Sequence, residues 1–311
     1  MSLYIKTPLK PLARINEKTG KNFMVKLESY QPDGSFKIRG VSRLCEELKA
    51  QGIREVITPS GGNAGHAAAC CARELGMEAT IVIPDTASSY AAEVIRREGA
   101  TVLTHGHIFD DAVEYAMALA RQHPSAFFMH PFDHPSLWAG HSTIVDELKE
   151  QLGDDEPDAI VLSVGGGGLF NGVIQGLDRN GWSDVPVIAV EPEGAPTLHA
   201  AIEAGHPVVL EQIDTLANTL AGKVASAQSV EYAKTHRVIS HLISDRSAAN
   251  GAIQFVEDFR ILVELACGAT MSVAYELPEI IKPFRNVVFI ACGGVGVNLP
   301  LLLEYKRIFD L

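Results

Sequence analysis

Short runs of β-branched and other apolar residues alternate with longer helical patterns along almost the whole chain. The predicted strands are 23–27, 55–58, 80–83, 101–104, 159–164, 187–190 and 287–291. Several of them are apolar throughout, which is typical of parallel strands covered by helices on both faces. Candidate helices lie between them at 64–75, 110–121, 142–151 and 247–259. This alternation predicts an α/β fold in which helices cover a mostly parallel sheet.

Three of the predicted strands end in clusters of glycine. The strand at 55–58 is followed by Ser60-Gly61-Gly62-Asn63, the strand at 159–164 by four glycines at 165–168, and the strand at 287–291 by Gly293-Gly294-Val295-Gly296. Ligands of parallel α/β sheets bind at the carboxyl ends of the strands. Free backbone N–H groups at a helix N-terminus attract anions. The three clusters therefore predict a ligand with anionic groups.

The four consecutive glycines are the strongest single signal. They forfeit conformational entropy and side-chain packing, so the backbone is expected to approach a ligand closely, and we favour a phosphate. A Rossmann dinucleotide site is the alternative, but the third glycine of its GxGxxG spacing falls on Phe170 or Asn171. Glu191 ends the next strand, roughly where a ribose-binding acid of such a site could lie, so the alternative is weakened but stays open. The Gly222-Lys223 pair is followed by Val224 and does not match a P-loop.

Three other features carry candidate chemistry, each with a simpler structural interpretation. Lys37 follows the turn sequence Pro32-Asp33-Gly34 at the start of a helical stretch. It is either an ordinary surface lysine or an amine that forms an imine with a carbonyl cofactor. The 60–63 loop is either a capped turn or a cradle for a substrate carboxylate, with the Asn63 amide free for a hydrogen bond. Cys292 at a strand end is either a core residue or a thiol that hydrogen-bonds a heterocyclic nitrogen.

Charge and cysteine content narrow the class of protein. The 38 acidic against 26 basic residues give a net charge of −12, without the basic stripe of nucleic-acid-binding proteins. No apolar run reaches the roughly 18 residues that a membrane span needs. Five cysteines without a CxxC pair favour a cytoplasmic, soluble protein with reduced thiols. His105 and His107 have no companion ligand and no Cys/His spacing matches a zinc template, so no zinc site is expected.

In their order along the chain, these motifs strongly resemble the β family, or fold type II, of pyridoxal-phosphate enzymes. Residues 31–40, 163–169 and 264–269 look like the short, catabolic L-serine dehydratase/L-threonine deaminase group of that family. The resemblance implies a tryptophan synthase β-like fold of two open twisted α/β domains with the cofactor between them. The expected large cofactor-binding domain comprises 1–39 and 140–311, and the small substrate-carboxylate domain comprises 40–139.

The resemblance also implies roles for individual residues. Lys37 would bind the cofactor through an imine bond, with Phe36 beside the ring and Cys292 facing the pyridine nitrogen. The remaining cofactor-binding positions would be Asn63 at the 3′-oxygen, Pro131 near the cofactor, and Gly165, Gly166, Gly167, Gly168 and Leu169 at the phosphate. The substrate carboxylate would be held by Ser60, Gly61 and Asn63. Members of the group also bind a monovalent or divalent cation, and the matching positions are Gly165, Glu191, Ala195, Leu220 and Gly222.

The implied reaction is pyridoxal-phosphate-dependent β-elimination from L-serine, and also from L-threonine, to pyruvate or 2-oxobutyrate plus ammonia. Lys37 would remove the Cα proton. Gly61 stands where serine racemases carry a serine, so racemisation is disfavoured and modest turnover is expected. The chain ends at Leu311, so no regulatory domain and no isoleucine inhibition are expected, and a homodimer is the family expectation. Two alternatives remain open: β-replacement of the cysteine synthase type, and a non-catalytic protein that binds pyridoxal phosphate or a nucleotide.

Overall fold

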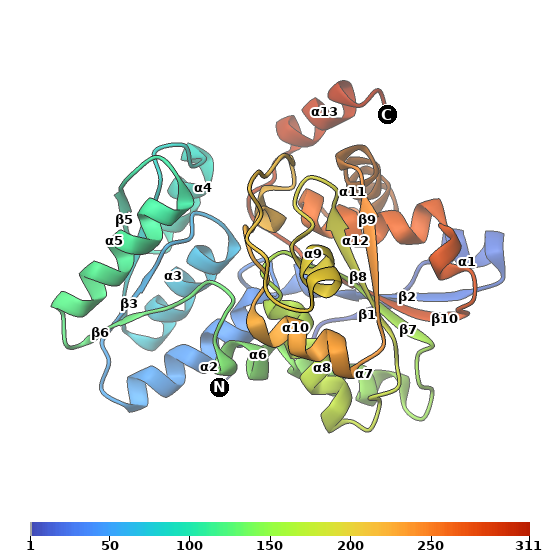
Figure 1. Ribbon diagram of the computed structural model, residues 1–311, viewed down its shortest axis with the longest axis horizontal. Coiled ribbons are helices and arrows are strands. Elements are labelled where there is room, and N and C mark those ends of the chain that lie inside the picture. The colour runs from blue at the N-terminus through green and yellow to red at the C-terminus, as the bar shows by residue number, and fades with distance from the viewer. Residues whose placement is uncertain (1) are drawn as a thin grey trace.

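The strands form two separate sheets, each at the centre of its own lobe (Figure 1). The structure is a computed structural model that describes residues 2–311. The larger sheet has the strand order β1-β2-β10-β7-β8-β9, in which only β1 runs antiparallel to its neighbour. The smaller sheet has the order β5-β4-β3-β6 and is parallel throughout. The α/β fold with mostly parallel sheets is confirmed.

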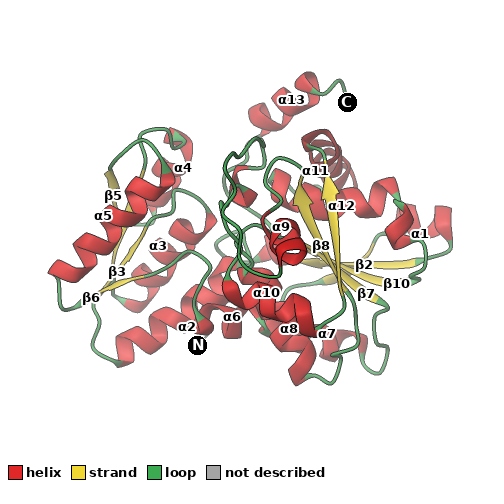
Figure 2. Cartoon of the chain, in the orientation of Figure 1, coloured by secondary structure: helices red, strands yellow, loops and turns green. Residues whose placement is uncertain are grey.

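The larger sheet and the helices around it come from both ends of the chain (Figure 2). Its strands are β1 (Leu9–Pro11), β2 (Asn22–Leu27), β7 (Ala159–Ser163), β8 (Val187–Pro192), β9 (Val238–Ile243) and β10 (Asn286–Ala291). Its helices are α1 (Ala13–Thr19), α7 (Thr143–Leu152), α8 (Gly168–Arg179), α9 (Thr197–Ala204), α10 (Ala227–Thr235), α11 (Asp245–Phe259), α12 (Leu265–Glu276) and α13 (Leu299–Ile308). Short 3-10 turns lie at η1 (Glu28–Tyr30), η2 (Asn218–Leu220) and η3 (Glu279–Ile281).

The smaller sheet is continuous in sequence. Its strands are β3 (Glu55–Thr58), β4 (Glu78–Ile83), β5 (Thr101–Thr104) and β6 (Ala126–Phe128), with helices α3 (Asn63–Leu75), α4 (Ser89–Arg97) and α5 (Phe109–Gln122). Helix α2 (Lys37–Ala50) packs in the core of the smaller lobe and runs along its lower side in Figure 1, and α6 (Pro135–His141) lies near the centre of the molecule. All four strands of this sheet fall within 40–139, the segment expected to form the small domain. The domain boundaries themselves stay a prediction.

All seven predicted strands are present, with ends that differ by two residues or fewer, and so are the four predicted helices. Three strands were not predicted, namely β1, β6 and β9. Strands β1 and β6 have only three residues each and lie at sheet edges. Strand β9 is also an edge strand and carries the polar residues Ser240 and His241 among half-buried neighbours. Edge strands lack the continuous apolar run that made the central strands recognisable.

Three helices cross closely enough that their contact points accept only glycine. A Cβ on Gly40 of α2 would lie 2.5 Å from the Leu137 carbonyl oxygen of α6, and one on Gly140 would lie 2.3 Å from the Arg39 carbonyl oxygen. A Cβ on Gly172 of α8 would lie 2.5 Å from the Cβ atom of His141. These contacts hold the start of α2 at a set distance from the start of α8. Lys37 and the four glycines stand at those two helix starts.

Two further observations concern the chain as a whole. Among residues 2–311, no helix combines the length and the apolar character that crossing a membrane requires. All five cysteines (Cys45, Cys70, Cys71, Cys267 and Cys292) are free and buried. Thiols therefore contribute to the cores of both lobes as small apolar groups.

Candidate active site

Lys37 is the first residue of α2, at the end of a tight turn. The Gly34 N–H donates to the Gln31 carbonyl over 2.8 Å, and Gly34 has a φ of +77°, so the predicted turn is confirmed. The Lys37 amine donates a hydrogen bond of 2.9 Å to the Pro131 carbonyl and lies 5.2 Å from the centre of the Phe36 ring. Burial of the amine lowers its pKa from 10.5 to about 8, because the charged form is poorly solvated there.

The four glycines connect β7 to α8 and leave their N–H groups available. Gly167 has a φ of +94°, and a Cβ on it would lie 2.0 Å from the Ser229 hydroxyl oxygen, so only glycine is accommodated. Within residues 2–311, no acceptor receives a hydrogen bond from the N–H groups of Gly165 through Leu169. Such a group of free N–H donors at a helix N-terminus is a built anion site.

A layer of polar side chains behind the glycine loop holds its shape. The Asn171 amide donates to the Ser226 hydroxyl over 2.9 Å and accepts from the Ser229 hydroxyl over 2.8 Å. The Ser226 N–H donates to the Gly166 carbonyl over 3.0 Å. These bonds occupy carbonyl and side-chain groups of the loop without using its N–H donors. The loop is therefore preorganised for an anion.

Residues 131 and 132 bring the amine and the glycine loop into one site. The Pro131 carbonyl receives the Lys37 hydrogen bond, and the Phe132 ring lies where a Cβ on Gly166 would approach it to 2.3 Å. The Phe132 carbonyl in turn accepts from the Trp138 indole over 2.8 Å, which anchors the segment on α6. The structure thus brings together Lys37, Pro131 and the glycine loop.

Cys292 follows β10 and lies beside the turn that carries Lys37. Its carbonyl accepts from the Phe36 N–H over 3.1 Å, and its sulfur is 3.9 Å from the Ser163 hydroxyl oxygen. Cys292 is also near enough to the Lys37 amine to act on its charge. The predicted group of Phe36, Lys37 and Cys292 therefore lies together at the carboxyl ends of β7 and β10 in the larger sheet.

The 60–63 loop reaches the site from the smaller sheet, but the prediction that the Asn63 amide is free was wrong. Asn63 donates through Nδ2 to the Glu264 carboxylate over 3.0 Å and accepts through Oδ1 from the Val295 N–H over 2.9 Å. A buried carboxylate must be hydrogen-bonded, and the nearest amide supplies a donor. The second N–H of the Asn63 amide is left for a ligand. Ser60 and Gly61 lie in the same loop, where the Ser60 hydroxyl accepts from the Gly62 N–H over 3.4 Å.

Sequence reasoning missed Glu264 as a functional residue. It lies just before α12, is buried, and also accepts from the Thr219 hydroxyl over 3.0 Å and from the Gly296 N–H over 2.7 Å. Burial raises the pKa of its carboxyl group, opposed by these hydrogen bonds. A signal was present, because the acid interrupts the apolar stretch Val263–Ala266. A buried acidic residue inside an apolar run normally has an ion-pair or hydrogen-bond partner.

The five positions implied for a cation also lie close together, around Thr197, which was not predicted to be part of the site. The Thr197 hydroxyl lies 2.7 Å from the Gly165 carbonyl oxygen and 3.0 Å from the Glu191 carboxylate. A Cβ on Gly165 would lie 3.1 Å from the Leu220 Cα atom, and one on Gly222 would lie 3.8 Å from the Gly165 carbonyl carbon. The Ala195 carbonyl accepts from the Thr197 N–H over 3.0 Å.

Glu191 is the single carboxylate of this group, and it is fully buried. It accepts from the N–H groups of Leu198 and His199 over 2.7 and 2.8 Å. Burial nevertheless raises the pKa of this carboxyl group to about 7. A cation bound beside it would favour the ionised form.

These features fit pyridoxal phosphate. An amine with a pKa of about 8 is partly neutral near neutral pH, which imine formation with an aldehyde requires. The N–H donors of the glycine loop suit a phosphate, and Cys292 places a sulfur atom that can form a hydrogen bond near the amine. The donor set matches the three chemical parts of that cofactor, namely its aldehyde, phosphate and ring.

Comparison with known proteins indicates the same cofactor. Residues 1–293 match the family described as "Pyridoxal-phosphate dependent enzyme". The chain is 43% identical to the human L-serine dehydratase/L-threonine deaminase, over 98% of this chain and 95% of the relative. It is 37% identical to the L-serine dehydratase of Dictyostelium discoideum, over 96% and 90%. The crystal structure of a fungal L-serine ammonia-lyase from Rhizomucor miehei superposes with a TM-score of 0.94 at 36% identity, covering 99% of this chain and 100% of that one.

The family match covers both sheets, and the structural match covers the whole site described above. The expected fold type II architecture and the pyridoxal-phosphate cofactor are therefore confirmed. The alternative of a Rossmann dinucleotide site is excluded by the same matches. The chain belongs to the family of pyridoxal-phosphate-dependent enzymes.

Proposed function

We propose that this protein is an L-serine ammonia-lyase that also accepts L-threonine, releasing ammonia with pyruvate or 2-oxobutyrate. The relatives named for serine and threonine deamination match nearly the full chain. The observation that carries the proposal is the Lys37 amine, held 2.9 Å from the Pro131 carbonyl with a pKa lowered to about 8, in the same site as the anion-binding glycine loop. That combination provides a base beside a phosphate anchor.

Pyridoxal phosphate, when bound, withdraws electrons from the Cα atom of the amino acid and thereby acidifies its proton. Lys37 takes that proton at Nζ, which requires the neutral amine that burial favours. The Pro131 carbonyl orients the amine. Ser60, Gly61 and the second N–H of Asn63 hold the substrate carboxylate. Loss of the β-hydroxyl as water completes the elimination.

Two residues, Gly61 and Cys292, are expected to set the outcome of the reaction. Gly61 has no side chain with which to return a proton to the opposite face of the substrate, so elimination is favoured over racemisation. Cys292 would hydrogen-bond the ring nitrogen of the cofactor. With that partner the cofactor would act as a milder electron acceptor than with an aspartate, which suits an elimination.

A monovalent or divalent cation is proposed at the group formed by Glu191 and the backbone of Gly165, Ala195, Leu220 and Gly222. Support comes from the Thr197 hydroxyl, which lies within hydrogen-bond distance of both Glu191 and Gly165. This ion would stabilise the base of the glycine loop. A homodimer and the domain boundaries at 40 and 139 remain predictions from the family resemblance, and a cytoplasmic location remains a prediction from the cysteine pattern.

The test combines a visible absorbance spectrum with a pyruvate assay. The cofactor-loaded enzyme is expected to change its absorbance on addition of L-serine and to release pyruvate and ammonia in equal amounts. Lys37→Ala is expected to lose the absorbance of the bound cofactor and to lower activity at least ~10³-fold. A colourless protein, or a variant that keeps full activity, would overturn the assignment.

Two further assays separate the remaining reactions. Chiral chromatography of the products is expected to show no D-serine. Added sulfide is expected to leave the pyruvate yield unchanged, whereas conversion of L-serine to cysteine would indicate β-replacement instead.

A further inference from the structure

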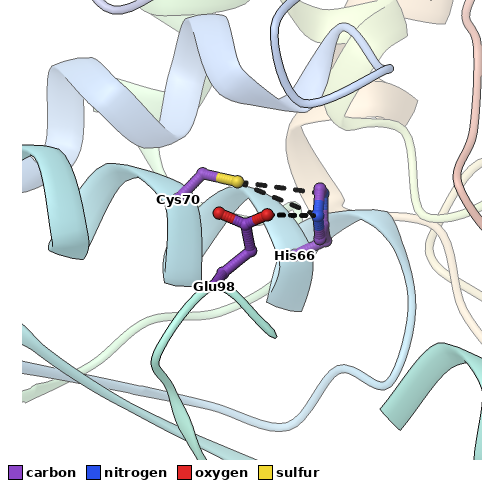
Figure 3. Close-up of side chains that lie close together, drawn as sticks. All are labelled: His66, Cys70 and Glu98. Atoms are coloured by element: carbon purple, nitrogen blue, oxygen red, sulfur yellow. Dashed lines mark hydrogen bonds and ion pairs between the residues drawn. The ribbon is translucent and has the colours of Figure 1, made fainter. Parts of the chain in front are cut away.

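Within residues 2–311, three side chains with metal-binding atoms converge in the smaller lobe, outside the site built around Lys37 (Figure 3). His66 and Cys70 are four residues apart on α3, so they project from the same helix face. Glu98 follows directly after α4. The ring nitrogen, the sulfur and a carboxylate oxygen all lie within 4.8 Å of one another. Neither the reaction nor the cofactor uses any of these residues.

The spacing is close to that of a tetrahedral metal site. His66 Nε2 is 3.9 Å from Cys70 Sγ and 3.7 Å from Glu98 Oε1. Around Zn²⁺, with bonds of about 2.0 Å to nitrogen or oxygen and about 2.3 Å to sulfur, a nitrogen–oxygen pair is about 3.3 Å apart and a nitrogen–sulfur pair about 3.5 Å. Side-chain movements of a few tenths of an ångström bring the two pairs to those distances. Glu98 stands at the end of α4, and its flexible side chain can make such a movement.

The contacts around the cluster leave its ligand atoms facing one another. His66 is buried, with Nε2 facing both Cys70 and Glu98. Arg73 binds Glu98 through Oε2 only, which leaves Oε1 facing the histidine. Ligation by Cys70 breaks its S–H bond, forms a metal–sulfur bond and releases one proton to solvent.

The cluster lies next to a surface hollow. The hollow has a volume of about 280 Å³ and is lined in part by Ala69, Arg73 and Glu98, so of the three cluster residues it borders Glu98 alone. An ion bound by the three side chains would join α3 to the end of α4.

We propose that His66, Cys70 and Glu98 bind one divalent ion of the zinc class, with water as the fourth ligand. A mixed set of nitrogen, sulfur and oxygen suits Zn²⁺ or Co²⁺, whereas Mg²⁺ and Ca²⁺ require oxygen ligands. The site differs in this respect from the oxygen-only group around Glu191. The sequence-based expectation of no zinc site rested on templates with closely spaced ligands, and Glu98 lies 28 positions from Cys70.

Cobalt substitution tests the proposal by a readout that is independent of catalysis. The cofactor-loaded enzyme, without a polyhistidine tag, is titrated with Co²⁺, and the spectrum of the metal-free holoenzyme is subtracted. One equivalent of Co²⁺ is expected to give a thiolate-to-cobalt charge-transfer band and tetrahedral d–d bands at the red end of the visible spectrum. Added Zn²⁺ is expected to displace the cobalt and abolish both.

Cys70→Ser is expected to lose the charge-transfer band and to bind Co²⁺ at least ~100-fold more weakly. Cys71→Ser is the matched control, since Cys71 is a buried thiol on the same helix that is not part of the cluster, and it is expected to keep the full cobalt spectrum. His66→Gln provides a second disruption should the serine variant fold poorly. Sub-stoichiometric binding, or a spectrum that survives Cys70→Ser, would show that the three residues form only an ion-pair cluster. Failure of serine deamination would leave this result unaffected.

Discussion

At the scale of single residues, the reactivity of Lys37 depends on where its amine lies. An exposed lysine has a pKa of about 10.4 and is almost entirely charged at neutral pH. Burial against Phe36 and the Pro131 carbonyl lowers the pKa of Lys37 to about 8, with Cys292 opposing the shift. The protein thus supplies a nucleophile and base mainly by removing water from one amine.

This pKa predicts how fast pyridoxal phosphate attaches to the cofactor-free protein. Only the neutral amine attacks the aldehyde, so the rate should rise with pH and level off above a midpoint of about 8. Stopped-flow absorbance across pH 6 to 11 measures it, with Lys37→Ala as the blank. A midpoint near that of free lysine would show that the amine is solvated.

Arg39, two residues after Lys37, is expected to be essential for stability. It is buried and holds two carboxylates, Glu28 at 2.6 and 2.8 Å and Glu147 at 2.7 and 2.8 Å. Arg39→Leu leaves Glu28 buried without its ion-pair partner and leaves Glu147 only its pair with Lys26 at 2.6 Å, so it should reduce the free energy of unfolding by about 3–5 kcal/mol.

Arg43 on the same helix gives the control for Arg39. Its ion pair with Glu47 is solvent-exposed, so Arg43→Leu should change the free energy of unfolding by about 0.5 kcal/mol or less. Urea denaturation of the two variants measures the difference. Equal losses would contradict the assigned importance of the buried network.

At the scale of single elements, the site is built where β7 passes into α8. The strand is buried throughout, and the helix begins only at Gly168, after a residue in the left-handed conformation. The N–H groups of the first helical turn therefore have no partner within the helix. Local backbone geometry makes this segment an anion site, and the bonds of Asn171 and Ser226 hold it in shape.

Gly167→Ala tests that geometry. The variant must adopt a φ of +94° and place its Cβ 2.0 Å from the Ser229 hydroxyl, so the loop should shift and cofactor affinity should fall at least ~10-fold. Gly181→Ala is the control, since Gly181 has a φ of +73° but no atom within 4 Å of an added Cβ. It should cost about 1 kcal/mol in stability and leave cofactor affinity unchanged. Fluorescence titration with pyridoxal phosphate distinguishes the two.

At the scale of the whole molecule, the site exists only because two sheets meet. Asn63 begins a helix of the smaller lobe, yet both polar atoms of its amide are bound by the larger lobe, at Glu264 and at Val295. Thr219 and Gly296 complete the hydrogen bonds to Glu264. The position of the substrate loop therefore depends on one buried carboxylate that lies 201 positions from Asn63 in the chain.

Glu264→Gln should loosen this connection. All three partners of the carboxylate are donors, so the amide NH₂ group of glutamine must face one of them. The expected loss is about 1–3 kcal/mol of unfolding free energy, together with a rise in KM for L-serine that exceeds any fall in kcat. Glu279→Gln, which removes an exposed ion pair with Lys282, should change neither value. Steady-state kinetics and thermal unfolding check both variants, and an unchanged KM would count against a role for Glu264 in positioning the loop.

Much of the fold was predictable because its central strands are apolar on both faces, as β7 and β8 show. The predicted site residues around Lys37 and the glycine loop do come together, since each motif is local and since the glycine loop and Cys292 directly follow two strands of the larger sheet. The edge strand β9 and the hydrogen-bonded state of the Asn63 amide were not predictable. Both depend on neighbours that are distant in the sequence.

The amino-acid sequence by itself determined the order of the seven predicted strands, the turn before Lys37 and the glycine loop after β7, because these follow from local backbone sterics and from side-chain periodicity. Only the tertiary structure decided which groups face one another: Glu264 with Asn63, Thr197 with Glu191, and Glu98 with His66. It also decided the pKa of Lys37. The reason is that burial and long-range hydrogen bonds arise from packing between segments that no local pattern records.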